Sequence, residues 1–207
     1  MAETSRFWDR IADKYARSPI THEDDYQTKL TVTRSYMRPD MKVLEFGCGT
    51  GGTAIAHAPF VEHIRAIDFS PVMLDKARQK MAQAAVENVV FERADITSEP
   101  LPQSPYDMVL GLSILHLLRN PEAIVTKVYQ MLAPGGYFVT STACLGDNMA
   151  FFRYIVPVGR ALGVMPYVNV MTTEAVIAML KSAGFEIAHR WKPAADRALF
   201  VVARKPA

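Results

Sequence analysis

The sequence predicts an α/β fold, a seven-stranded and mostly parallel sheet with helices on both faces, whose last two strands form an antiparallel hairpin. Apolar runs of strand length alternate with segments of helical periodicity, as in parallel strands joined by crossover helices. A glycine-rich turn at residues 47–52 stands between the first apolar run and a helical segment. Only residues 192–197 separate the last two apolar runs, and so short a connection makes those strands antiparallel neighbours.

Each expected strand is a short apolar run closed by a turn signal. The expected strands are 42–46, 63–68, 89–93, 108–112, 137–142, 185–191 and 198–204. The expected helices are 5–17, 26–37, the segment from the glycine turn through residue 60, 71–85, 121–132 and 173–184. Ser70 before Pro71 predicts an N-cap, and Thr173 predicts another. The three prolines in 97–105 predict a loop, and Pro134-Gly135-Gly136 predicts only a helix stop.

Length and composition are those of an ordinary globular domain. The chain has 207 residues, and half of them are apolar, which is enough to bury a full core in one domain. We expect two capping segments on that domain, an N-terminal helical cap at 1–38 and an apolar insertion at 145–171 between the fifth and sixth strands.

The charge and the cysteine content limit the kinds of partner and metal site that the sequence predicts. The net charge is +2 and the basic residues are scattered among 21 acids, so no nucleic-acid partner is expected. Cys48 and Cys144 form no C-x-x-C pattern, which predicts neither a metal site nor a disulfide framework. The first fifteen residues lack the apolar run of a signal peptide, and we expect a cytoplasmic protein. Nothing in the sequence indicates an oligomeric state.

One apolar stretch has nearly the length of a membrane span. Residues 151–171 contain Arg153, Arg160, Pro157 and Pro166, and the two arginines would lie deep in the hydrocarbon at a cost of several kcal/mol. We therefore expect no transmembrane segment and interpret this stretch as a buried or surface-docking cap.

The glycine turn fits two kinds of cofactor. Gly47, Gly49 and Gly52 satisfy the G-x-G-x-x-G pattern of dinucleotide sites. Glu45 followed by Gly47, Gly49 and Gly51 resembles the first motif of S-adenosylmethionine-dependent methyltransferases. The glycines alone do not separate the two, because both cofactors need a sharp turn and a close approach of the backbone.

Acids at the ends of three expected strands favour the second cofactor. Both cofactors need an acid at the end of the second strand to bind ribose hydroxyls, and Asp68 stands there. Glu45 would repel a pyrophosphate but attract the ammonium group of a methionine moiety. Asp95 ends the third strand, where it suits the amino group of adenine. The closing antiparallel hairpin is also unlike the usual dinucleotide-binding order.

Five motifs stand in the order and at the spacing of one enzyme family. They are 45–51, 68–73, 94–96, 106–118 and 132–136. On these motifs the chain resembles class I S-adenosylmethionine-dependent methyltransferases, particularly their small-molecule branch, over about residues 40–142. The resemblance implies a Rossmann-like sheet and a single methyltransferase domain over 1–207. It also implies S-adenosylmethionine as cofactor, with S-adenosylhomocysteine as product.

The resemblance also implies a set of cofactor-binding residues. They are Tyr15, Glu45, Gly47, Gly49, Gly51, Asp68, Phe69, Met73, Asp95, Ile96, Leu112 and Ser113. Asp68 would bind the ribose hydroxyls, Phe69 and Met73 would pack on adenine, and Asp95 would meet its amino edge. Tyr15 ends an aromatic-x-x-x-Ala-x-x-Tyr pattern that in this family often belongs to a helix covering the cofactor.

Several of these residues have a purely structural alternative. Asp68 and Asp95 also suit helix or turn caps, since loops after strands favour aspartate. Met73 also suits the core side of its helix, and Tyr15 also suits the packing face of a docked helix. These alternatives stay open on the sequence alone.

His116 is the best candidate for acid–base catalysis. Methyl transfer from a sulfonium is an in-line displacement that depends mainly on positioning, and a general base is needed only for a protonated acceptor. His116 follows the fourth strand, where this family often lines the acceptor pocket, but its leucine neighbours also suit a structural histidine. His57 and His63 are expected at the surface.

The acceptor is predicted only by class. The apolar and aromatic excess of 145–171 favours a small hydrophobic or aromatic acceptor, and leaves a lipid-like acceptor and peripheral membrane contact open. Two alternative functions are kept. An NAD-dependent reductase would need a Tyr-x-x-x-Lys pair that is missing after the fourth strand, and a non-catalytic cofactor-binding regulator would fit an incomplete cofactor site.

Overall fold

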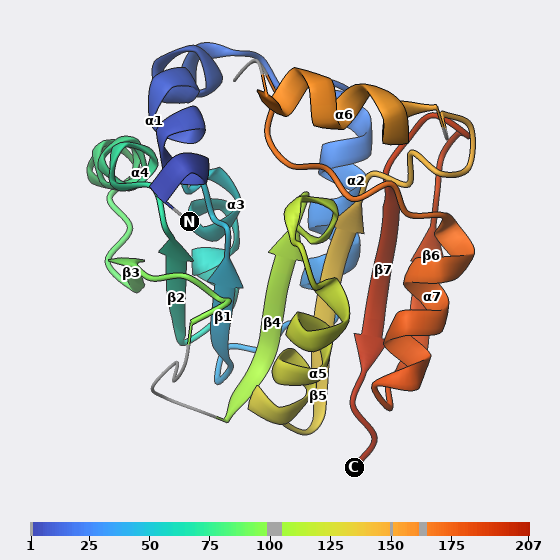
Figure 1. Ribbon diagram of the computed structural model, residues 1–207. Helices are drawn as coiled ribbons and strands as arrows, with labels where there is room; N and C mark the ends of the chain where they lie inside the picture. Colours follow the sequence, from blue (N-terminus) through green and yellow to red (C-terminus); the bar gives the residue numbers. More distant parts are fainter. Residues whose placement is uncertain (1, 99–104, 150, 162–164) are drawn as a thin grey trace. The chain divides into compact units, whose positions relative to one another are not determined.

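The computed structural model describes residues 2–98, 105–149, 151–161 and 165–207 (Figure 1). The chain forms two compact units, Met1–Leu110 and Gly111–Ala207. Residues 99–104 of the predicted loop, and residues 150 and 162–164 of the predicted apolar insertion, lie outside the described residues.

The strands that the structure describes form one seven-stranded sheet in the order β3-β2-β1-β4-β5-β7-β6. They are β1 (Lys42–Phe46), β2 (His63–Asp68), β3 (Val89–Arg93), β4 (Tyr106–Leu112), β5 (Leu132–Thr142), β6 (Glu186–Trp191) and β7 (Leu199–Arg204). β1 lies parallel to β2 and β4, and β2 lies parallel to β3. β7 pairs antiparallel with both β5 and β6. The predicted fold class is confirmed.

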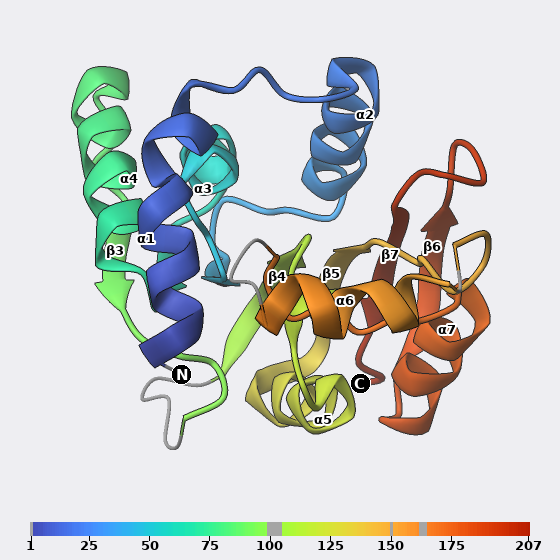
Figure 2. The ribbon, with the colours of Figure 1, turned by 45° about the horizontal axis from the view of Figure 1, so that its top comes forward.

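In the first unit, α1 is fixed against the start of α4. The helical segments of this unit are α1 (Ala2–Arg17), α2 (Glu23–Arg34), α3 (Gly52–His57), η1 (Ala58–Phe60) and α4 (Pro71–Ala84). Figure 2 shows α1 beside α4, and Asp13 of α1 pairs with Lys76 of α4 at 2.6 Å between oxygen and nitrogen. The Ser70 hydroxyl donates to Asp9 at 2.6 Å and accepts from the Met73 amide at 3.2 Å. Ser70 is thus the predicted N-cap of α4 and also a contact of α1.

In the second unit, a helix of the predicted insertion lies across the carboxyl end of β5 (Figure 1). The helical segments of this unit are η2 (Leu115–Leu117), α5 (Pro121–Met131), α6 (Phe152–Ala161) and α7 (Thr173–Ser182). The N-cap of α7 is Thr172, whose hydroxyl accepts from the Ala175 amide at 3.1 Å. The prediction of a cap at Thr173 is therefore wrong by one residue. None of the described helices is long and apolar enough to cross a membrane.

The largest boundary differences from the sequence prediction are at β5 and α2. β5 begins at Leu132 rather than 137, because the chain beyond β7 pairs with the Pro-Gly-Gly segment. The Gly135 amide donates to the Lys205 carbonyl at 3.0 Å, and the Lys205 amide donates to the Gly136 carbonyl at 2.8 Å. The second predicted helix, 26–37, begins and ends three residues earlier, as α2.

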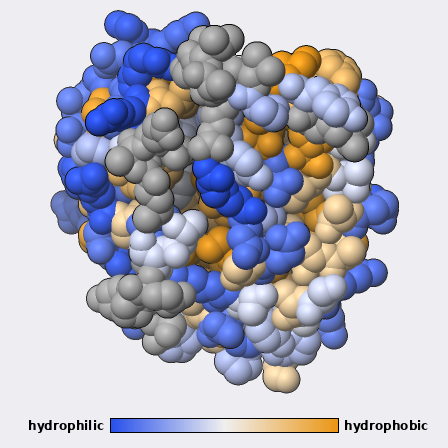
Figure 3. Space-filling view, viewed as in Figure 1, coloured by the Kyte–Doolittle hydropathy of each residue, from blue (hydrophilic) through white to orange (hydrophobic). Residues whose placement is uncertain are grey.

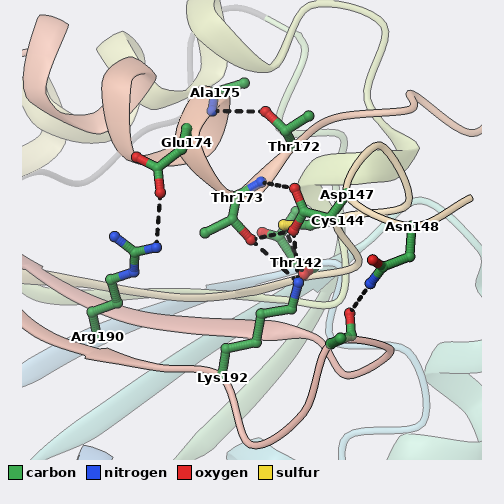
Figure 4. A network of polar contacts seen from close by, with 11 residues as sticks. Thr142, Cys144, Asp147, Asn148, Thr172, Thr173, Glu174, Ala175, Arg190 and Lys192 are labelled. Carbon is green, nitrogen blue, oxygen red and sulfur yellow. Dashed lines mark hydrogen bonds and ion pairs between the residues drawn. The ribbon is translucent and has the colours of Figure 1, made fainter. Parts of the chain in front are cut away.

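The two ends of the apolar insertion are bonded together (Figure 4). The Gly146 amide donates to the Met171 carbonyl at 2.8 Å. Asp147 accepts from the Thr173 amide at 2.9 Å, from the Thr173 hydroxyl at 2.5 Å and from the Lys192 ammonium at 2.6 Å. These bonds join the segment after β5, the start of α7 and the end of β6. The insertion is therefore a loop with fixed ends.

Candidate functional site

The glycine turn after β1 adopts a backbone that requires glycine. Gly47, Gly49 and Gly51 have φ of 65°, 53° and 73°, a region that favours residues without a β-carbon. A β-carbon at Gly51 would also lie 2.5 Å from the Phe91 ring and 2.8 Å from Ala77. The turn therefore lies tightly against β3 and α4.

Asp68, the last residue of β2, braces this turn. One of its carboxylate oxygens accepts from the Gly49 amide at 2.9 Å, and the other accepts from the Ser70 amide at 2.8 Å. The residue is 7% exposed, and burial raises its pKa while these two amide bonds lower it. A carboxylate offers about four acceptor positions, so two bonds leave capacity for further hydroxyl donors.

Glu45 is a buried carboxyl group with an orphaned oxygen. It lies in β1 beside the turn and is 3% exposed. Its Oε2 atom has no hydrogen-bond partner among the residues that the structure describes. Burial, with the charge of Asp68 as a second cause, raises the pKa of Glu45 to about 8. A cationic donor placed at Oε2 would satisfy this oxygen and favour the ionised carboxylate.

Two tyrosines from the N-terminal helices lie near these carboxyl groups. A β-carbon at Gly49 would lie 4.0 Å from the ring of Tyr15, which comes from α1 and is 52% exposed. Desolvation, and then the charges of Asp68 and Glu45, raise the pKa of the Tyr15 hydroxyl. Tyr26 of α2 hydrogen-bonds Thr53, and burial raises its pKa, with the charge of Glu45 contributing.

Tyr26 is the site residue that the sequence analysis missed. It belongs to none of the five motifs, and a tyrosine in an amphipathic helix looks like a packing residue. The only feature of the sequence that could have indicated Tyr26 was its place in a helix of the predicted N-terminal cap.

The predicted adenine contacts lie directly after β2, on α4 and after β3. Met73 is 3% exposed and Ile96 is 5% exposed, whereas Phe69 is half-buried. Asp95 uses one carboxylate oxygen to accept from the amide and the hydroxyl of Thr97, both at 2.8 Å. The structure thus contains the turn-cap geometry that was the alternative for Asp95, and the core position that was the alternative for Met73. Their adenine contacts stay predictions.

Backbone hydrogen bonds join the carboxyl ends of the first three strands. The Cys48 amide donates to the Ile67 carbonyl at 3.1 Å, and the Ala94 amide donates to the Asp68 carbonyl at 3.1 Å. The predicted site residues of the first unit therefore gather at one edge of the sheet, where α/β folds bind ligands.

Leu112, Ser113 and His116 belong to the second unit. Leu112 is half-buried at the end of β4. Ser113 has φ of 56°, which is rare for a residue with a β-carbon, and its amide donates to the Ser141 carbonyl at 2.8 Å. His116 lies in η2, and burial lowers its pKa to about 4.

His57 is buried rather than at the surface, and that prediction is wrong. It is 0% exposed, and neither ring nitrogen has a hydrogen-bond partner among the described residues. Burial, with the charge of Arg34 as a second cause, lowers its pKa to about 3. The sequence prediction failed because α3 is a short helix of six residues, Gly52–His57, whose buried face is not evident from its sequence. Ala54 and His57 lie three residues apart on it and share its buried face.

Both cysteines are buried, and each contacts a nearby carbonyl. The Cys144 thiol lies 3.6 Å from the Thr142 carbonyl oxygen within the network of Figure 4, and burial raises its pKa. Burial also raises the pKa of Cys48. Neither thiol is activated as a nucleophile. In the described part of the chain, no group of His, Cys, Asp and Glu could hold a metal ion.

The charges of the first-unit site suit a ligand with a cationic group and hydroxyls. The charge of Asp9 raises the pKa of Asp68, and the charge of Asp68 raises that of Glu45. Carboxyl groups that raise one another's pKa gain from a cation placed between them. A pyrophosphate would instead add negative charge to this cluster.

Comparison with known proteins identifies relatives over most of the chain. Residues 37–193 match a family model described as a methyltransferase domain. A sterol 24-C-methyltransferase of Neurospora crassa is 26% identical over 170 residues, covering 78% of this chain and 43% of that protein. Phosphoethanolamine N-methyltransferase 1 of Arabidopsis thaliana is 31% identical over 163 residues, covering 76% of this chain and 31% of that protein. The chain thus spans less than half the length of these relatives.

The fold has a solved counterpart of similar length. The N-methyltransferase NodS of Bradyrhizobium japonicum, in complex with S-adenosyl-L-homocysteine, superposes with a TM-score of 0.75. It is 19% identical, and the alignment covers 99% of this chain and 100% of that one. At this identity the likeness shows a common fold.

Proposed function

Because the chain belongs to the methyltransferase domain family, we propose that it transfers the methyl group of S-adenosylmethionine to a small acceptor by in-line displacement. Family membership confirms the resemblance stated from the sequence motifs and, with it, S-adenosylmethionine as the cofactor of this class. The comparisons give no support to an NAD-dependent reductase. The family match also favours an enzyme over a non-catalytic regulator.

The observation that carries the proposal is the orphaned oxygen of Glu45. Its Oε2 atom is buried without a partner among the described residues, in the strand that leads into a glycine turn. A buried acceptor without a donor costs free energy, about 1–3 kcal/mol. The ammonium group of a methionine moiety would supply that donor, so the residues present fit the cofactor.

Other residues of the first unit would hold the rest of the cofactor. We propose that Asp68 accepts from the ribose hydroxyls and that Gly47, Gly49 and Gly51 allow the backbone to approach the methionine end. Phe69, Met73 and Ile96 would then pack around adenine and Asp95 would accept from its amino group. Tyr15, beside Gly49 and close to Asp68, would cover this ligand from α1.

Catalysis by this chain would consist mainly of positioning. The bound cofactor supplies a methyl group on a positively charged sulfur, and the protein holds the acceptor in line with it. Leu112 and Ser113, at the end of β4, are proposed to contact the methionine part. The strained backbone of Ser113 fits a functional position, since such strain gathers at ligand sites.

We propose a hydrophobic or aromatic acceptor that contacts the apolar surface of α6. Phe151, Tyr154 and Ile155 at this helix are 55%, 75% and 43% exposed. Figure 3 shows hydrophobic surface in the region of α6. An exposed apolar patch on a segment without acids suits a lipid-like acceptor or peripheral contact with a membrane. The relatives act on a sterol and on phosphoethanolamine by their names, which supports a small-molecule acceptor.

We further propose that both units form one methyltransferase domain, with residues 1–38 and 145–171 as its caps. The first cap contributes Tyr15 and Tyr26, whose pKa values respond to Glu45. The second cap has the fixed ends described above.

Binding of S-adenosylhomocysteine to Glu45→Gln tests the proposal. Isothermal titration at pH 7.5 should show affinity about tenfold or more below wild type, because the charge that faces the ammonium group is lost. Glu92→Gln is the matched control, since Glu92 pairs with Arg65 on the neighbouring strands. Equal affinity of wild type and Glu45→Gln would contradict the assigned orientation of the cofactor.

A further inference from the structure

The imidazole of His116 makes a contact that fixes which nitrogen carries its proton. The backbone amide of Ala143, directly after β5, points at Nδ1 of His116, with 3.4 Å between the two nitrogens. A backbone amide nitrogen only donates, so Nδ1 must present its lone pair. In a neutral imidazole the other nitrogen then carries the hydrogen, which makes Nε2 a donor.

The imidazole is also held in the neutral form. Burial lowers the pKa of His116 to about 4, so the ring carries one proton at neutral pH. A general base works best with a pKa near the working pH. With this pKa His116 would be a weak base. Its available lone pair, on Nδ1, faces the Ala143 amide rather than open space.

The loop that carries His116 is fixed on both sides. The His116 carbonyl accepts from the Asn169 amide at 2.7 Å, which ties η2 to the far part of the insertion. The Arg119 guanidinium lies 5.2 Å from the centre of the Tyr167 ring. His116 in η2 and Arg119 just after it therefore contact the segment 167–169, which holds the backbone of this loop in place.

Within the described part of the chain, the Nε2 atom of His116 still has its donor capacity unused. The ring is half-buried, and no hydrogen bond from Nε2 is found among the residues that the structure describes. A neutral N–H of this kind would complement an oxygen that carries negative charge, and would repel the N–H groups of an amine.

From this geometry, we propose that His116 donates a hydrogen bond through Nε2 to an oxygen of the methyl acceptor and does not remove its proton. The proposal rests on the proposed function and names the acceptor class, an aromatic or apolar molecule that binds as a delocalised oxyanion such as a carboxylate, enolate or phenolate. It replaces the role of general base, for which His116 was the sequence candidate.

The charge balance of the reaction fits such an acceptor. The nucleophile supplies an electron pair to the methyl carbon, and the carbon–sulfur bond breaks with its pair left on sulfur. An anionic acceptor and a sulfonium give a neutral methylated product and a neutral thioether. No proton is released, so no base is needed, and the donor at Nε2 holds the anion in place.

Nitrogen NMR of the imidazole tests the tautomer directly. The full chain, labelled with ¹⁵N-histidine and measured at pH 7 with S-adenosylhomocysteine, should show His116 with a protonated Nε2 and an unprotonated Nδ1. His116→Gln assigns the signals by their disappearance. A protonated Nδ1, or a doubly protonated ring at pH 7, would overturn the proposal. If the wild-type chain does not bind S-adenosylhomocysteine at all, that result would instead contradict the proposed function.

Benzoate, a small aromatic carboxylate, probes the acceptor class in the same sample. Benzoate should shift the His116 Nε2 signal, whereas benzylamine should leave it in place. His116→Ala should weaken benzoate binding by about tenfold or more, and His116→Gln, whose side-chain amide also donates, should restore most of it. A shift with benzylamine alone, no shift with benzoate, or equal loss in both variants would each count against an oxyanion acceptor.

Discussion

The Asp68 carboxylate at the end of β2 accepts a hydrogen bond at 2.9 Å from the Gly49 amide in the turn that follows β1. One residue predicted to bind ribose thus also sets the shape of the turn predicted to bind the methionine end. Cofactor affinity and the local structure of the turn are therefore expected to change together when Asp68 is altered.

Replacing Asp68 by Asn should weaken S-adenosylhomocysteine binding by at least tenfold. The amide keeps one acceptor oxygen but loses the charge and one of the two bonds to backbone amides. Isothermal titration measures the affinity and thermal unfolding measures the stability.

The matched control for Asp68 is Asp107→Asn. Asp107 also accepts from a backbone amide, that of Lys42 at 2.8 Å, but at the start of β1. The Asp107→Asn variant should lose some stability and keep its affinity for S-adenosylhomocysteine. Affinity that falls equally in both variants would point to a general loss of structure instead of a ribose contact.

Gly51→Ala should destabilise the fold by about 1–3 kcal/mol, from overpacking and from the left-handed backbone. The new methyl group would lie 2.5 Å from the Phe91 ring, at a φ of 73°. Gly52→Ala adds a methyl group at the start of α3, where nothing lies within 4 Å, and should be neutral or slightly stabilising. Urea unfolding of the two variants measures the difference, and equal midpoints would contradict the packing described here.

Glu45 should make stability fall as the pH rises. Its folded pKa, about 8, lies above its ordinary value of 4.5, so the folded state holds the proton more tightly than the unfolded chain. The contribution is complete below pH 4.5 and is lost as the pH rises through 8. Glu45→Gln should remove this slope, and urea unfolding between pH 5 and 8.5 measures it. Identical slopes for wild type and variant would refute the raised pKa.

The same carboxyl group should couple cofactor binding to proton release. Burial, and then the charge of Asp68, disfavour the ionisation of Glu45. An ammonium group at Oε2 would reverse that preference. Binding at pH 7 should therefore release close to one proton, measured by titration calorimetry in buffers of different ionisation enthalpy. The Glu45→Gln variant should release none.

His57 should make the fold sensitive to acid. Its folded pKa, about 3, lies below its ordinary value of 6.5, so its contribution is present above pH 6.5 and is lost as the pH falls toward 3. One such site corresponds to about 2 kcal/mol between pH 7 and pH 5. His57→Met should remove that part of the loss in urea unfolding, while His63→Gln, at the partly exposed start of β2, should not.

Asp147 should control the mobility of the insertion. Asp147→Asn weakens the bonds to Thr173 and Lys192 that hold the ends of this loop together. Hydrogen exchange in 145–171 should become faster, with exchange in β1 and β2 unchanged. Glu174→Gln removes an exposed ion pair with Arg190 at the same end of α7 and should leave that exchange near wild type. Equal acceleration in both variants would refute the role of Asp147 in holding the ends of the insertion together.

The parts of the site that the sequence predicted are those coded by local patterns. Asp68 was found because it ends an apolar run 21 residues after Gly47, and strand ends determine which residues share an edge of a parallel sheet. Ser70 was found because an N-cap before proline is a local signal. Both depend on neighbours in sequence, and both stand where expected.

The parts that the sequence did not reveal depend on distant packing. The burial of His57 follows from how a short helix lies in the fold, and the position of Tyr26 follows from where α2 lies beside Thr53. The early start of β5 follows from pairing with Lys205, some 70 residues away. The orientation of the His116 ring depends on the Ala143 amide, which comes from another part of the chain. This orientation determines which ring nitrogen carries the hydrogen.

Titration of the full chain with S-adenosylmethionine and, separately, with NADH shows which of the two cofactors the glycine turn binds. Isothermal titration calorimetry at pH 7.5 should show one site for S-adenosylmethionine, with affinity reduced in Asp68→Asn and Glu45→Gln and kept in Asp107→Asn. NADH should give no binding heat. Binding of NADH together with no binding of S-adenosylmethionine would contradict the account.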